Sequence, residues 1–157
     1  MPESAAASSG TVIAFDFGEK RIGVAVGEWL LRQAHPVSVI HAESSERRFA
    51  AIATLLAEWR PTALVVGQPT SLDGKATTMT ARCRRFGRQL YGRFGLPVVF
   101  IDERLSSADA AVRLRETGLD TRRAKKHLDA VAAQLILQSY FDGTAQSAAT
   151  AISLLPP

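Results

Sequence analysis

Acidic residues at the ends of apolar segments are the groups in this sequence that could perform chemistry. Asp16 ends the apolar run 11–15, the pair Asp102 and Glu103 ends another, and Asp129 has only leucine and alanine beside it. Functional groups in an α/β sheet gather beyond the carboxyl ends of the parallel strands, so acids at such ends should lie at one edge of the sheet. An ionised carboxylate on an apolar helix, such as Asp129, needs a partner, a metal ion or solvent.

Carboxylates that would repel one another can share a site when a divalent cation lies between them. Mg²⁺ prefers oxygen ligands and keeps several waters, so two or three acidic side chains can hold it. Two such ions about 4 Å apart can activate a water and stabilise the leaving oxygen during in-line attack on a phosphodiester. The alternative is structural: a turn acid beside Lys20 and Arg21, a strand-end ion pair and a helix acid that reaches solvent.

Length and composition indicate one globular domain. The chain has 157 residues and 46% hydrophobic content, without an apolar run near the roughly 20 residues that span a bilayer. Residues 1–10 lack the features of a signal peptide, so the protein is expected in the cytoplasm, without a membrane partner. Cys83 is the single cysteine, which excludes an internal disulfide. The three scattered histidines do not favour a zinc site.

The net charge of +4 permits a polyanionic partner but does not establish one. Arginine makes up most of the 19 basic residues and suits bidentate phosphate contacts. A genome rich in GC would produce the same arginine bias, so the charge alone does not decide between the two explanations.

Hydrophobic periodicity predicts an α/β fold with helices on both sides of a five-stranded mixed sheet. Three short strands with brief connections come first and favour antiparallel pairing, whereas the later alternation of helices and continuous apolar runs is typical of parallel crossover units. The predicted strands are 11–16, 22–27, 37–41, 63–67 and 97–102, and the predicted helices are 46–59, 79–94, a short one between Ser106 and Gly118, and 121–141. We expect a domain over 11–142 between flexible tails, 1–10 and 143–157.

Four segments closely resemble the YqgF family, in the same order along the chain. They are Asp-Phe-Gly-Glu-Lys-Arg-Ile-Gly-Val-Ala-Val (16–26), Val-Val-Gly-Gln-Pro-Thr-Ser-Leu-Asp-Gly (65–74), Asp-Glu-Arg-Leu-Ser-Ser (102–107) and Asp-Ala-Val-Ala-Ala-Gln-Leu-Ile-Leu-Gln-Ser-Tyr (129–140). Members of that family are described as Holliday junction resolvases and as pre-16S ribosomal RNA nucleases with a ribonuclease H-like fold. The resemblance is therefore specific for the family, and less so for the substrate.

The resemblance implies that Asp16, Glu103 and Asp129 are catalytic acids that bind Mg²⁺ or Mn²⁺. Strand alternation directs Asp102 and Glu103 to opposite faces, and the resemblance selects Glu103. It also implies that the basic residues after the acids contact nucleic acid; these are Lys20, Arg21 and Arg104.

Four basic residues open the last predicted helix, one to two turns before Asp129. Cations at a helix N-terminus oppose the macrodipole, so they lack a local structural reason and are expected to meet a phosphate backbone. They are Arg122, Arg123, Lys125 and Lys126. The arginines around the helix at 79–94 are instead expected to form a solvated face.

Two segments differ from the usual family pattern. Gly27-Glu28 stands where Ser-Asp is more frequent, and Gln68-Pro-Thr-Ser-Leu-Asp-Gly stands where Leu-Pro-Leu-Asn-Met-Asp-Gly is usual. Neither segment includes one of the three acids, so the differences concern loop contacts.

The function we expect is a metal-dependent endonuclease acting on structured nucleic acid, with 5′-end processing of pre-16S ribosomal RNA in ribosome biogenesis favoured. The partners would be a ribosomal RNA precursor, ahead of a four-way DNA junction, and pre-ribosomal particles. One alternative is a Holliday junction resolvase in DNA recombination and repair, which would need a homodimer. Another is a non-catalytic ribosome-assembly factor. A sugar kinase or ATPase is disfavoured because 157 residues do not provide a second lobe.

Overall fold

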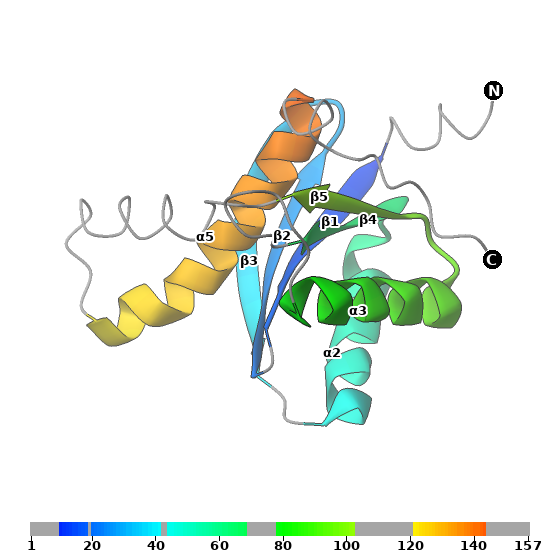
Figure 1. Cartoon of the computed structure of the whole chain (residues 1–157). Coiled ribbons are helices and arrows are strands. Elements are labelled where there is room, and N and C mark those ends of the chain that lie inside the picture. Colours follow the sequence, from blue (N-terminus) through cyan, green and yellow to red (C-terminus); the bar gives the residue numbers. More distant parts are fainter. Residues whose placement is uncertain (1–9, 19, 42–43, 69–77, 103–120, 144–157) are drawn as a thin grey trace.

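The computed structural model describes residues 10–18, 20–41, 44–68, 78–102 and 121–143, and for 121–128 the backbone alone. Five strands form one sheet in the order β3-β2-β1-β4-β5 (Figure 1). β1 pairs antiparallel with β2 and β2 with β3, whereas β1 pairs parallel with β4 and β4 with β5. The mixed α/β sheet predicted from the sequence is confirmed. The strands are β1 (Thr11–Phe17), β2 (Arg21–Glu28), β3 (Gln33–His41), β4 (Ala63–Gln68) and β5 (Val98–Asp102).

The edge strand β3 begins at Gln33, four residues before the predicted start at 37. Its first four residues, Gln33-Ala-His-Pro36, contain one small apolar residue, so apolar alternation does not reveal this part of the strand. Proline is tolerated at a sheet edge. Side chains from the last helix hold this extension: Gln138 accepts a hydrogen bond from the Ala34 amide at 3.0 Å, and Gln134 donates one to the Ala34 carbonyl at 3.0 Å.

Three helices are described, and the residues at both ends of the first and at the end of the second show why these helices begin or end there. The N-cap Ser44 accepts a hydrogen bond from the Arg47 amide at 3.2 Å, and Arg60 ends the same helix in the left-handed region before Pro61. Gly95, with a φ of +69°, follows the second helix. The helices are α2 (Ser45–Trp59), α3 (Thr78–Phe94) and α5 (Thr121–Asp142), which agree with the predicted ones. The predicted helix between residues 106 and 118 and most of the two tails lie outside the described residues.

The helices divide the interior into two cores, one on each face of the sheet. α2 and α3 cover one face and α5 covers the other (Figure 1). Along β1, Ile13 and Phe15 pack in the core under α2 and α3, whereas Val12 and Ala14 pack under α5. By the same alternation, Asp16 lies on the α5 face and Phe17 on the α2 and α3 face. Among the described helices, none is long and apolar enough to cross a membrane.

Candidate active site

Strand pairing and helix packing bring Asp16 and Asp129 together on the α5 face of the sheet. Asp16 pairs with Gly23 of β2 in the antiparallel ladder. Because Gly23 has no side chain, the backbone of Asp129 lies directly against it, and an added Cβ would overlap the Asp129 carbonyl. Both aspartates are partly exposed, so water can reach this end of the sheet.

An ion pair joins the two sequence segments that carry these acids. Nε of Arg21, the first residue of β2, lies 3.2 Å from Oδ2 of Asp129, and the side chains are 33% and 25% exposed. A pair this exposed contributes at most about 1 kcal/mol to stability, so its main effect is to place a positive charge beside the acid. The family resemblance predicts a nucleic-acid contact for Arg21 but not this pairing, since Arg21 and Asp129 are far apart in sequence.

The ends of β4 and β5 place a second polar group on the opposite face of the sheet. Gln68 is 5% exposed and pairs with Asp102 in the parallel ladder. Its Oε1 accepts a hydrogen bond from Nε of Arg84 on α3 at 3.1 Å. Asp102 is two residues after Phe100 in β5, so the two side chains lie on the same face of the sheet. Phe100 packs under α2 and α3, so Asp102 lies on the face opposite Asp16.

The hydrogen bond from Arg84 explains one difference from the family pattern. Gln68 stands where leucine is usual, and in this chain its buried amide oxygen is satisfied by a half-buried arginine. The other arginines of α3 that the sequence predicted to be solvated are exposed, as expected: Arg82, Arg85, Arg88 and Arg93.

The remaining predicted site residues are described in part or not at all. Lys20 is exposed in the connection between β1 and β2, close to Arg21. Glu103 and Arg104 lie outside the described residues. The four basic residues of the first turns of α5 (Arg122, Arg123, Lys125 and Lys126) have a described backbone and no described side chains.

The ligand atoms and the partial exposure of Asp16 and Asp129 suit a magnesium or manganese ion. Their carboxylate oxygens are the hard ligands these ions prefer, and partial exposure leaves room for the waters that complete the shell. Within the described ranges, no group of three or more His, Cys, Asp or Glu side chains could hold a metal. A complete ligand set would therefore draw its third acid from outside those ranges.

The sheet order and the two covering layers are those of a ribonuclease H-like fold. A solved structure of Fowlpox virus resolvase with substrate Holliday junction DNA matches this chain with a TM-score of 0.53. The match covers 85% of this chain and 98% of that chain at 11% identity, and it shows a shared fold.

The chain belongs to the RuvX (YqgF) family, whose model is described as "Holliday junction resolvase" and matches residues 10–143. A relative from Methylobacillus flagellatus, named "Putative pre-16S rRNA nuclease", is 59% identical over 92% of this chain and 99% of its own length. A relative of the same name from Dechloromonas aromatica is 62% identical over 85% of this chain and 91% of its own length. The protein is therefore a member of a nuclease family, as the sequence segments indicated.

Proposed function

We propose that this protein is a metal-dependent endonuclease whose active site lies at the carboxyl end of β1. The observation that carries the proposal is the placement of Asp16 and Asp129 close together, on the same face of the sheet and partly exposed to solvent. Two separate elements, a strand and the last helix, hold them there. Two acids in this arrangement have no evident role in the core, and they match the first and last acids of the family pattern.

Asp16, Glu103 and Asp129 would hold Mg²⁺ or Mn²⁺. The chemistry that such an ion would supply is an activated water for attack on the phosphorus and charge stabilisation of the leaving oxygen. Glu103 lies outside the described residues, and its inclusion is supported by the family pattern. Arg21 lies beside Asp129, so Arg21 and the ion would both interact with the Asp129 carboxylate. The guanidinium of Arg21 would also be placed to contact a substrate phosphate.

Basic residues on either side of the acids would position the nucleic-acid backbone. Lys20 lies in the connection between β1 and β2, and Arg21 is the first residue of β2. At a rise of about 1.5 Å per residue, the basic cluster of α5 lies about 4–11 Å along the helix axis from Asp129. The proposed contacts, besides Lys20 and Arg21, are Arg104, Arg122, Arg123, Lys125 and Lys126. Such contacts fix the position of the substrate without reading its sequence.

The substrate we propose is the 5′ region of pre-16S ribosomal RNA, cut in the cytoplasm within pre-ribosomal particles. The support is the name shared by relatives that are 59% and 62% identical to this chain. The description of the family model supports a second candidate, the four-way DNA junction. Resolution of a junction requires two sites facing opposite strands, and hence a dimer.

The test compares both substrates under the same conditions. A precursor RNA fragment with its 5′ leader and a mobile four-way junction are incubated with the protein in Mg²⁺ or Mn²⁺ at several salt concentrations. Asp16→Asn should abolish cleavage. The matched control is Asp142→Asn, because Asp142 is exposed and lies about 20 Å further along α5 than Asp129.

Each outcome separates the candidates. Cleavage of the RNA alone, lost in Asp16→Asn and kept in the control, supports the RNA-processing nuclease. Symmetric nicks in the junction would instead support a Holliday junction resolvase. Binding of either substrate without metal-dependent cleavage would refute the nuclease and favour an assembly factor.

A further inference from the structure

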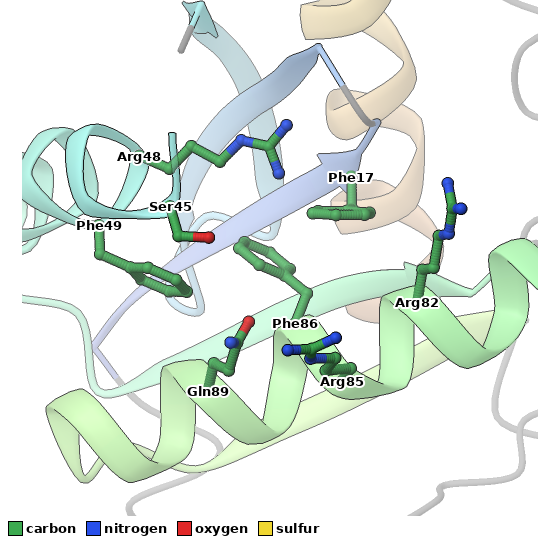
Figure 2. A pocket seen from close by; sticks show the side chains of 8 residues that line it. All are labelled: Phe17, Ser45, Arg48, Phe49, Arg82, Arg85, Phe86 and Gln89. Carbon is green, nitrogen blue, oxygen red and sulfur yellow. The ribbon is translucent and has the colours of Figure 1, made fainter. Parts of the chain in front are cut away.

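A cavity of about 260 Å³ opens between α2 and α3, on the face of the sheet opposite α5 (Figure 2). Three arginines, three phenylalanines, a serine and a glutamine line it, and we call it the arginine cavity. Figure 2 shows Ser45 and Arg48 projecting from α2 and Arg82, Arg85 and Gln89 from α3, around the ring of Phe86. The proposed active site uses none of these side chains.

The charge of the arginine cavity indicates an anionic ligand. Arg48, Arg82 and Arg85 are permanently charged, and no acidic residue is among the described residues that line the cavity. A positively charged lining of this kind attracts an anion. The guanidinium group matches phosphate in particular, because its N–H groups contact two phosphate oxygens at once.

The floor of the arginine cavity is aromatic, which a site for a simple anion would not need. The Phe17 and Phe86 ring centroids are 4.7 Å apart at an interplanar angle of 31°, and Cζ of Arg48 lies 5.4 Å from the centroid of Phe17. Aromatic rings and guanidinium planes beside a basic groove are the surfaces on which single-stranded bases stack. Bases within a duplex are already stacked, so such a floor favours an unpaired nucleotide.

The position of the arginine cavity connects it with the proposed active site. Phe17 directly follows Asp16 in β1, and strand alternation places the two side chains on opposite faces of the same strand end. A strand of nucleic acid that crosses the end of β1 could therefore contact both. At about 30 Å³ per water, the cavity has the volume of about nine waters, enough for a phosphate and part of a base.

We propose that the arginine cavity binds one nucleotide, with its phosphate between the three arginines and its base against the partly exposed ring of Phe17, which the buried Phe86 supports. The ligand is a nucleotide of a single-stranded segment adjoining the bond that is cut, or a free nucleotide of the same chemistry. The adjoining position rests on the proposed function, whereas nucleotide binding does not.

The test measures binding without metal, so that it is independent of cleavage. The probe is a fluorescein-labelled oligouridylate of eight nucleotides, titrated in EDTA and followed by fluorescence anisotropy. The double variant Arg82→Gln/Arg85→Gln should weaken binding about ten-fold or more, because two charge-assisted contacts are lost. It should also reduce the slope of log Kd against log salt by about 1.4, at about 0.7 per phosphate contact.

The matched control removes the same charge from outside the cavity. Arg47 and Arg88 are exposed on the same two helices and do not line the cavity, so Arg47→Gln/Arg88→Gln should weaken binding less than about three-fold. Equal weakening by the two double variants would overturn the proposal, since general attraction would then explain both. Thermal unfolding of each variant verifies that the fold is intact.

Competition experiments distinguish a nucleotide from a simple phosphate as the ligand of the arginine cavity. Unlabelled uridine monophosphate should displace the oligouridylate at lower concentration than inorganic phosphate does, and Phe17→Leu should weaken binding about five-fold or more. Equal potency of phosphate and the mononucleotide would overturn the nucleotide site. Tighter binding of the oligouridylate than of the mononucleotide supports the strand as the source, and the reverse supports a free nucleotide.

Discussion

Replacement of Gly23 by alanine tests whether close packing of α5 on β2 creates the candidate active site. The added Cβ would overlap the carbonyl oxygen and carbon of Asp129 and approach the backbone nitrogen of Ala130 to 3.1 Å. These are backbone atoms within a helix, so no side chain can rotate to relieve the overlap. The helix itself would have to move away from the sheet, and Asp129 would move with it.

The expected loss of stability in Gly23→Ala follows from the cost of overpacking a core. Inserting one methyl into a packed core costs about 1–3 kcal/mol, and an overlap with backbone belongs near the upper end, about 2–3 kcal/mol. For a chain of this size each kcal/mol lowers the Tm by about 2–4 °C, so Gly23→Ala should lower the Tm by about 4–12 °C. The assays are thermal unfolding by circular dichroism and calorimetric titration with Mn²⁺, whose affinity should fall as the acids separate.

The matched control is Gly92→Ala, in the last turns of α3. An added Cβ at Gly92 would meet no atom within 4 Å, and alanine favours a helix by about 0.5–1 kcal/mol relative to glycine. Gly92→Ala should therefore raise the Tm slightly. The packing argument is refuted if Gly23→Ala unfolds at the wild-type Tm, or if it lowers the Tm and leaves Mn²⁺ binding unchanged.

Three further predictions address interactions of single side chains. Arg21→Gln removes the positive charge beside Asp129, so calorimetry should show tighter Mn²⁺ binding, with a change in unfolding free energy below about 1 kcal/mol; weaker Mn²⁺ binding would contradict this role. Arg84→Ala leaves the buried Gln68 oxygen without its donor and should cost about 1–3 kcal/mol in urea unfolding, whereas in a Gln68→Leu background the same change should cost clearly less; equal costs would exclude coupling. Burial raises the pKa of Tyr140 above 10.0, so the unfolded state loses this proton first and stability should fall as the pH rises past about 10; Tyr140→Phe should reduce that fall, and an unchanged pH profile would argue against it.

The fold followed from the sequence because its signals are local. Alternation in β1 and the apolar spacing of α3, where Cys83, Phe86 and Leu90 are buried, depend on residues close to one another in the chain. The start of β3 could not be predicted in the same way. Glutamines on α5, more than 100 residues away, supply the hydrogen bonds that hold Ala34 in the sheet.

The role of the acids as metal ligands stays a prediction, and the sequence did not predict the side-chain contacts around them. Strand ends and helix surroundings marked Asp16 and Asp129 as exceptional, and the structure brings these two together. The Arg21 and Asp129 ion pair and the bond from Arg84 to Gln68 join residues on different elements. Their distances depend on how α5 and α3 pack on the sheet, which periodicity does not specify.

The two acids that the fold brings together come from opposite ends of the chain. Asp16 and Asp129 are about 110 residues apart, and α5 also completes the core on its side of the sheet. During synthesis at about 5–20 residues per second, the second acid follows the first by about 6–23 s. A growing chain therefore has neither the acid pair nor the core that supports it until α5 has emerged, so a partly made nuclease does not meet nucleic acid with its acids assembled.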